Sequence, residues 1–190
     1  MDFEEARRIV KDQLTKDRYE HTLRVCETAM NLAEIYGESK EKVALASIFH
    51  DYAKCLPKDQ LKQLVQTYKL PSQLLDYHHE LWHGPVGAKL VEDKYEIKDE
   101  DILNAIRFHT TGRPQMSQIE LIVFISDYIE PARSFPGLDE VRKLAKENLQ
   151  TAAQQALKNT IIHLVNKNAL IYPDTILAYN DLTKKGVVKR

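Results

Sequence analysis

VALASIFHD, residues 43–51, is an apolar helical run that ends in two polar side chains, His50 and Asp51. Its continuous apolar character predicts a buried helix at this point of the chain. An unpaired carboxylate is costly to bury, so Asp51 needs a compensating charge. A metal ion would compensate Asp51 and would accept the neutral imidazole of His50 as a second ligand. The stretch therefore predicts a helical core with a metal site inside it.

The rest of the chain continues the helical pattern and predicts an all-α protein. Glycine is scarce, with six residues, and β-branched alternation is hard to find. The 190 residues contain no repeat and no long linker, which predicts a single domain over residues 1–190. We expect helices at about 2–14, 17–36, 40–54, 57–70, 85–94, 99 or 101–109 and 118–130, one or two helices over 138–168, a last helix from 173, and a short segment at 71–79.

Bulk properties exclude several partner classes. The formal net charge is −1 and no long run of one sign occurs, so neither nucleic-acid nor membrane binding is expected. The N-terminal MDFEEARRIV lacks the apolar core of a signal peptide, and no stretch approaches the roughly 18 apolar residues of a membrane span. Cys26 and Cys55 form no CxxC pair, and both are expected as small core residues in a reduced, cytoplasmic setting.

Two further polar residues lie in helical surroundings similar to those of His50 and Asp51. His21 falls on the second expected helix, and Asp127 interrupts the apolar stretch IVFISDYIEP, where a charge requires compensation. Together with His50 and Asp51 they form a nitrogen and oxygen ligand set. Such a set suits iron, manganese or zinc better than magnesium.

A second metal position is also predicted near Asp51. His50 and Asp51 differ by about 100° around a helix, and the two carboxylate oxygens of Asp51 could bridge two ions. His83 and His109 could complete the second position. Two ions roughly 3.5–4 Å apart can clamp a phosphate for in-line displacement.

Other histidines have simpler explanations. A lone histidine on a helix is more often a core or surface residue than a ligand, and only the joint occurrence of several favours ligation. His78 and His79, in DYHHE, are expected at the surface. His163, in NTIIHLVNK, has apolar helical neighbours and is expected in the packed core.

The order His21, His50-Asp51, Asp127 resembles the HD-domain superfamily of metal-dependent phosphohydrolases. A closer resemblance is to the bacterial HD-domain symmetrical diadenosine-tetraphosphate hydrolases, over about residues 15–182. The bare histidine and aspartate order is moderately specific, whereas SDYIEPAR following HTTG is much more so. The segments that carry the closer resemblance are RYEHTLRV, FHDYAK, WHGPVGA, FHTTGRP, SDYIEPAR and PDTILAYN.

This resemblance implies a helical bundle that holds one or two iron ions and cuts a dinucleoside tetraphosphate into two nucleoside diphosphates. By position, it implies that His21, His50, Asp51 and Asp127 hold the principal metal. His83 and His109 would hold a second metal or contact substrate phosphate. The ligand types themselves leave iron, manganese and zinc open.

Several other residues are expected to meet the substrate. Arg18, one turn before His21, and Arg133, after the Asp127 helix, could each reach a phosphate. Thr110 could donate a hydroxyl beside His109, as could Thr111. Lys54, one turn after His50, is grouped with His50 and Asp51 as catalytic, because its charge would lie near the leaving group. Thr175, in the final segment with Pro173 and Asn180, is expected to close over a nucleotide.

The resulting hypothesis is hydrolysis by a metal-activated water that attacks an inner phosphate. One alternative is another HD phosphohydrolase, either a nucleotidase or a cyclic-dinucleotide phosphodiesterase. A second is a nucleotide sensor without turnover, although a complete ligand set argues against it. A structural metal site is disfavoured because such sites are usually rich in cysteine. Region 138–168 could support a homodimer or pack within one chain.

Overall fold

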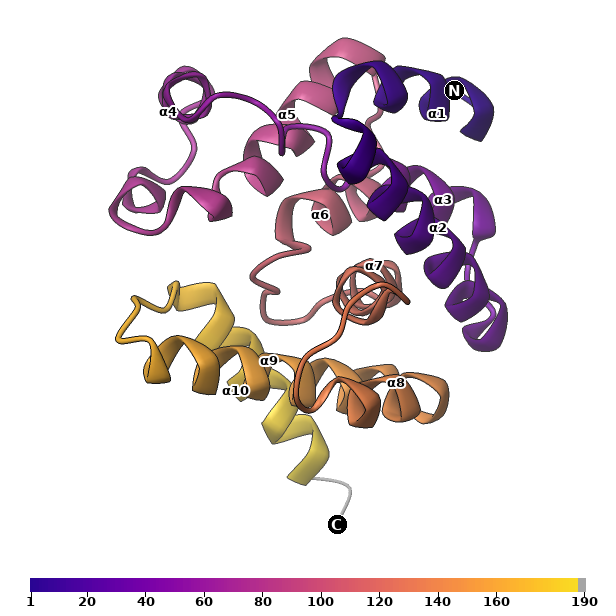
Figure 1. The fold of residues 1–190 in the computed structure, drawn as a ribbon, viewed down its shortest axis with the longest axis vertical. Helices are drawn as coiled ribbons and strands as arrows, with labels where there is room; N and C mark the ends of the chain where they lie inside the picture. Colours follow the sequence, from indigo (N-terminus) through magenta and orange to yellow (C-terminus); the bar gives the residue numbers. More distant parts are fainter. Residues whose placement is uncertain (188–190) are drawn as a thin grey trace.

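The computed structural model describes residues 1–187 and confirms an all-α protein (Figure 1). No strand occurs among these residues. No helix among them has the length and apolar character required to cross a membrane. The elements are α1 (Phe3–Gln13), α2 (Lys16–Tyr36), α3 (Lys40–Phe49), α4 (Lys58–Thr67), the 3-10 helices η1 (Ser72–Asp76) and η2 (His79–Leu81), α5 (His83–Tyr95), α6 (Glu100–Phe108), α7 (Gln118–Ile129), α8 (Leu138–Glu147), α9 (Leu149–Asn166) and α10 (Pro173–Val187).

Side-chain caps define where several helices begin. A cap oxygen that accepts a backbone N–H satisfies one of the free donors in the first helical turn. The cap of α7 is a full capping box, in which Ser117 and Glu120 bond each other's backbone. Gly37 ends α2 with a left-handed backbone, φ 67°. Side-chain caps are present at Asp2, Ser39, Asp99, Ser117 and Asn148.

Helix α7 lies at the centre of the fold and joins its two parts. It packs against α2, α3 and α6 on one side and against α8 and α9 on the other. In Figure 1, α1–α6 lie above α7, and α8–α10 form a layer below it. Ile122, Val123 and Ile125 are completely buried within this contact. The carboxyl end of α7 is therefore fixed next to residues from several other helices.

The third helix is shorter than expected and ends at Phe49 rather than near residue 54. The Nδ1 atom of His50 donates a hydrogen bond to the Ser47 carbonyl oxygen at 2.7 Å. In a continued α-helix, the backbone N–H of Asp51 would donate to this same carbonyl. The chain then continues in tighter turns, with Lys54 N–H donating to the Asp51 carbonyl at 2.8 Å. His50 and Asp51 thus occupy the turn after α3.

Two other boundaries also differ in detail from the expectation. Helix α5 begins at His83, which places Pro85 inside its first turn, where no backbone donor is needed. The region 138–168 contains two helices that meet at Asn148, whose extended backbone ends α8. The Asn148 side chain then accepts the Thr151 N–H and starts α9.

Two expectations about burial are wrong. Cys26 is buried, but Cys55 is exposed, because it lies in the turn that follows the shortened α3. His163 is also exposed, because it lies on a stretch of α9 that other elements leave uncovered, together with apolar residues such as Val165. His78 is exposed and His79 is partly exposed, as expected.

Candidate metal centre

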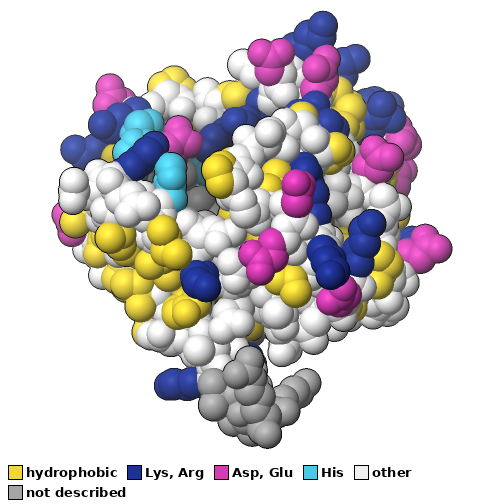
Figure 2. Space-filling model, turned by 60° about the horizontal axis from the view of Figure 1, so that its bottom comes forward, with side chains coloured by type: hydrophobic (Ala, Val, Ile, Leu, Met, Phe, Trp, Pro, Cys, Tyr) yellow, Lys and Arg dark blue, Asp and Glu magenta, His cyan; other side chains and the backbone are white. Residues whose placement is uncertain are grey.

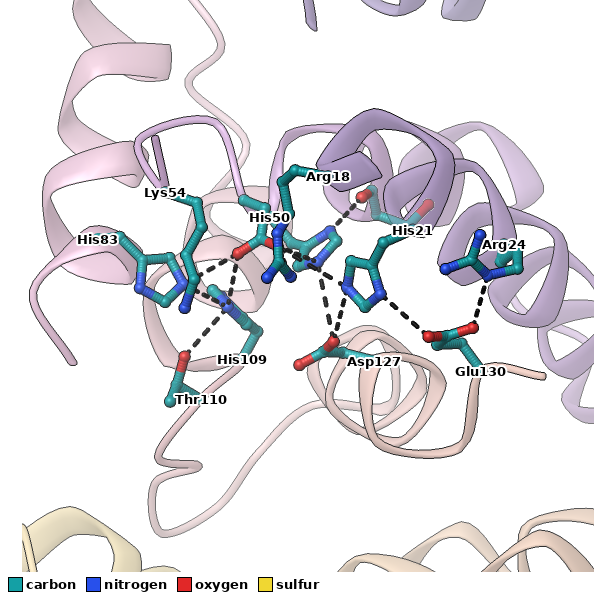
Figure 3. Close-up of polar contacts among 12 residues, drawn as sticks. Arg18, His21, Arg24, His50, Lys54, His83, His109, Thr110, Asp127 and Glu130 are labelled. Carbon is teal, nitrogen blue, oxygen red and sulfur yellow. Dashed lines mark hydrogen bonds and ion pairs between the residues drawn. The ribbon is translucent and has the colours of Figure 1, made fainter. Parts of the chain in front are cut away.

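Asp51 lies within contact distance of four histidines. Figure 3 shows these histidines, His21, His50, His83 and His109, grouped in one site. Its Oδ1 is 3.0 Å from His83 Nε2 and 3.7 Å from His109 Nε2. Its Oδ2 is 3.4 Å from His50 Nε2 and 3.7 Å from His21 Nε2. Each carboxylate oxygen thus faces one pair of histidines. The cluster contains two possible metal positions that share Asp51, each with ligand atoms within 4.8 Å of one another.

Three of the imidazoles are oriented by carbonyl groups of their own chain segment. In each case Nδ1 contacts the backbone oxygen of the residue three positions earlier. A carbonyl can only accept, so Nδ1 carries the proton and Nε2 presents its lone pair to the cluster in the neutral ring. The contacts are His50 to Ser47 at 2.7 Å, His83 to Glu80 at 2.5 Å and His109 to Ile106 at 2.8 Å.

The Nε2 atoms of this cluster fit a bound cation. Those of His83 and His109 are 2.9 Å apart, and with both Nδ1 atoms protonated two lone pairs face each other. The Nε2 atoms of His21 and His50 are buried and have no hydrogen-bond partner. Buried polar atoms normally find partners. A divalent metal ion would accept these lone pairs, so the donor set is suited to one.

The fourth histidine is oriented by a carboxylate that the sequence analysis missed. His21 Nδ1 lies 3.2 Å from Glu130 Oε1, and Glu130 Oε2 also accepts from Arg24 Nε at 2.8 Å and from the Ala132 N–H at 2.8 Å. A carboxylate behind a histidine fixes the tautomer and raises the basicity of a metal ligand. The available signal was the position of Glu130 within SDYIEPAR, three residues after Asp127.

Asp127 lies at the edge of the cluster. Its Oδ1 is 3.1 Å from His21 Nε2 and 4.0 Å from His50 Nε2. The same oxygen accepts from Arg133 Nη2 at 2.6 Å. Arg18 makes a similar contact on the other side, with Nη1 3.0 Å from Asp51 Oδ2. Both predicted arginines therefore lie against the carboxylates of the cluster.

The electrostatics favour the metal-binding forms of Asp51, Asp127 and His109. Burial opposes ionisation of Asp51, but the neighbouring imidazoles of His50 and His83 hold its pKa well below the usual range. Burial is likewise outweighed at Asp127, where the adjacent His21 ring and the Arg133 charge lower the pKa. Burial, followed by repulsion from His83 and His50, lowers the pKa of His109 to about 3. At neutral pH the two carboxylates are anionic and His109 is neutral.

A cavity of about 250 Å³ opens directly onto the cluster. Its wall includes three basic side chains, Arg18, Lys54 and Arg133. Thr110 Oγ1 lies 3.0 Å from His109 Nε2, and Lys54 forms an ion pair with Glu80 at the rim. A space-filling view shows histidine and basic side chains around a hollow on one face of the molecule (Figure 2). The cavity therefore suits an anion placed against the cluster.

Not every predicted residue reaches this cavity. Thr175 is buried and is not part of the cavity wall, and its backbone N–H donates to the Tyr172 carbonyl. The hydroxyl of Thr111 donates to the Gly112 carbonyl, also outside the cavity. The burial of Thr175 and its contacts therefore give no support to a role in substrate binding. The residues that the structure does bring together are Arg18, His21, His50, Asp51, Lys54, His83, His109, Thr110, Asp127 and Arg133.

Comparison with known proteins assigns this site to a class. The model of the HD domain matches residues 18–132, a range that contains the whole histidine and aspartate cluster. A crystal structure from Clostridium acetobutylicum, described as a predicted HD superfamily hydrolase involved in NAD metabolism, superposes with a TM-score of 0.92. It is 39% identical and covers 97% of this chain and 98% of its own. The fold and the site are those of an HD-domain protein.

Two curated relatives narrow the assignment. The symmetrical bis(5'-nucleosyl)-tetraphosphatase of Bacillus subtilis is 52% identical over 180 residues, 95% of this chain and 97% of the relative. A protein with the same description from Halalkalibacterium halodurans is 50% identical over 177 residues, 93% of this chain and 95% of the relative. The chain belongs to the HD-domain family of symmetrical bis(5'-nucleosyl)-tetraphosphatases.

Proposed function

We propose that this protein hydrolyses dinucleoside tetraphosphates symmetrically, so that diadenosine tetraphosphate and water give two molecules of ADP. The observation that carries the proposal is the convergence of four histidine Nε2 atoms around Asp51, beside a cavity walled by basic side chains. Relatives of this chain with that activity in their names cover nearly its whole length, which supports the same reaction here.

The arrangement of cavities supports a long substrate with its phosphates at the centre. A cavity of about 350 Å³, lined in part by Thr15 and Asp17, shares Arg18 and Arg133 with the central cavity. Another cavity, of about 590 Å³, shares Tyr128, Arg133 and Thr160 with the central one. Arg133 therefore contributes to all three cavities. A tetraphosphate in the central cavity would leave room for a nucleoside in each of the two adjoining cavities.

We assign the metal to His21, His50, Asp51 and Asp127, with His83 and His109 either holding a second ion or contacting phosphate. When bound, the metal supplies positive charge and lowers the pKa of a coordinated water. Arg18, Lys54 and Arg133 are proposed to neutralise the phosphates and the charge that develops on the leaving oxygen, and Thr110 to donate a hydrogen bond. Attack at an inner phosphorus breaks its bond to the central bridging oxygen, so a nucleoside diphosphate is both leaving group and product.

Iron is the proposed resident metal, by resemblance, with manganese and zinc as the alternatives that the ligand types also allow. Metal analysis of protein purified without oxygen tests this assignment. We further propose that residues 1–190 act as one domain in the cytoplasm. A homodimer through α8 and α9 is the alternative to a monomer, and light scattering distinguishes the two.

Chromatography of the products formed from diadenosine tetraphosphate tests the reaction itself. ADP as the sole nucleotide product is the expected result. A mixture of AMP and ATP would place the attack at a different phosphorus and overturn the symmetrical register. Absence of turnover would overturn the proposal in favour of another HD phosphohydrolase or a sensor, and a panel of nucleoside monophosphates and cyclic dinucleotides would separate these. Asp51→Ala protein, purified identically, controls for contaminating hydrolases.

A further inference from the structure

A cavity of about 590 Å³ adjoins the metal centre but contains none of the proposed metal ligands. One wall is Tyr128 on α7, another is the loop with Phe135, and the third is α9. Tyr128, Arg133 and Thr160 line both this cavity and the central one, so the two adjoin. Its volume lies within the range typical of sites for small organic ligands.

Two aromatic rings form one side of this cavity. The rings of Tyr128 and Phe135 meet edge to face, with centroids 5.2 Å apart and an interplanar angle of 85°. Phe135 is 38% exposed, which is unusual for a phenylalanine held in place by another ring. An exposed aromatic face in a cavity is suited to stacking against a flat heterocycle.

The wall formed by α9 carries an amide whose donor has no partner. Asn159 Oδ1 accepts from Gln155 Nε2 at 3.0 Å, which fixes the orientation of the amide, while its Nδ2 is buried and has no hydrogen-bond partner. A buried donor without an acceptor is unfavourable, and a ligand can supply the acceptor. His163 and Asn166 follow at helical spacing and extend this polar wall.

The backbone around Asn159 leaves space for its amide. Gly137 has φ 82°, and a Cβ atom at this position would lie 3.1 Å from Asn159 Nδ2. Glycine therefore allows both the left-handed turn and the close approach of the loop to α9. The loop that carries Phe135 and the helix that carries Asn159 are thus held together as adjoining walls of one cavity.

We propose that this cavity binds one nucleoside of the substrate, with a purine base stacked on the exposed ring of Phe135 and a base nitrogen or carbonyl oxygen accepting from Asn159 Nδ2. The inference rests on the proposed function for the identity of the substrate. Arg133, which lines both cavities, would then contact the phosphates next to this nucleoside. Asn159 and Phe135 become determinants of nucleoside binding rather than of phosphate chemistry.

Equilibrium dialysis tests the inference without relying on turnover. We expect Phe135→Ala and Asn159→Ala each to raise the Kd for ADP about tenfold, the range found when a base loses a stacking partner or a buried hydrogen bond. The Kd for inorganic diphosphate, which lacks the nucleoside, should stay unchanged in both variants. Val165→Ala, an exposed residue of α9 outside the cavity wall, is the matched control and should alter neither value.

The possible outcomes separate the inference from the proposed function. Unchanged ADP binding in both variants would overturn the nucleoside site even if diadenosine tetraphosphate is cleaved. Equal loss of ADP and diphosphate binding would also overturn it, because that result indicates general damage to the centre. Selective loss of ADP binding supports the nucleoside site even if the protein does not cleave diadenosine tetraphosphate. In that case the proposed reaction is wrong and the nucleoside site is retained.

Discussion

Asp51 is the one carboxylate that both pairs of histidines share, with Oδ1 facing His83 and His109 and Oδ2 facing His50 and His21. Its removal should therefore affect both metal positions together. Loss of a partner behind a metal ligand typically costs 10–100-fold in metal affinity or activity, so loss of the shared ligand should exceed this.

We expect Asp51→Ala to reduce both bound metal and turnover by more than about a hundredfold. Elemental analysis of the purified variant, with turnover measured on the same sample, checks both quantities. Asp139→Ala, whose side chain is 97% exposed, is the matched control and should behave as wild type. Full metal content in Asp51→Ala would contradict the shared-ligand role.

Glu130→Gln tests the carboxylate behind His21. The amide retains the shape of the side chain but removes the charge that strengthens His21 as a ligand and pairs with Arg24. We expect metal affinity to fall about 10–100-fold, measured by competition with a chromophoric chelator. Glu147→Gln, on the exposed end of α8, should leave the affinity unchanged. An unchanged affinity in Glu130→Gln would show that His21 needs no orienting charge.

At the scale of single residues, the sequence predicts the members of the cluster better than their supports. His21, His50, Asp51 and Asp127 are recognisable because polar side chains stand out in apolar helices. Glu130 was missed because its contact with His21 joins residues 109 positions apart and depends on how α2 meets α7. No local pattern contains that information.

At the scale of elements, most helix positions follow from caps and periodicity, whereas the ends near the cluster do not. The helices that follow Ser39 and Ser117 begin at residues 40 and 118, where the sequence predicts them. Helix α3 stops early because a side chain, His50, competes with the backbone for a carbonyl. Helix propensity alone cannot predict this competition, because the hydrogen-bond partner of His50 depends on the orientation of its ring in the folded protein.

The close approach of α5 to α6 depends on Gly84. A Cβ atom at Gly84 would lie 2.8 Å from the Arg107 carbonyl oxygen and 3.2 Å from that of Ile106, both rigid backbone atoms. Gly84→Ala should therefore push the two helices apart and destabilise the protein by about 1–3 kcal/mol. Because His83 on α5 faces His109 after α6, metal affinity should fall as well.

Urea unfolding followed by circular dichroism measures the stability of Gly84→Ala. Gly186→Ala in the last turn of α10 is the matched control, since a Cβ atom there meets nothing within 4 Å. Removing a helical glycine without a clash should raise stability slightly, by at most about 1 kcal/mol. Equal stability of Gly84→Ala and wild type would show that α5 and α6 can separate freely.

At the scale of the whole molecule, the metal centre connects segments from residue 21 to residue 127. Without a cation, the facing lone pairs of His83 and His109 repel each other, and the buried Nε2 atoms of His21 and His50 lack hydrogen-bond partners. Metal removal by a chelator should therefore lower the Tm. A ligand at 100 times its Kd stabilises a protein by about 2.7 kcal/mol. Differential scanning calorimetry with and without added metal checks this, and Asp51→Ala should show no such difference.

His50, His83 and His109 each hydrogen-bond to a carbonyl only three residues earlier, so each ring is set by its own short stretch of chain. Most of the cluster's ring orientation is thus independent of the rest of the sequence. Substitutions outside these short stretches should therefore leave the three ring orientations unchanged. His21, whose orientation comes from Glu130 on a distant helix, lacks this independence. Substitutions in the surrounding protein should therefore change the ring orientation of His21 before that of the other three histidines.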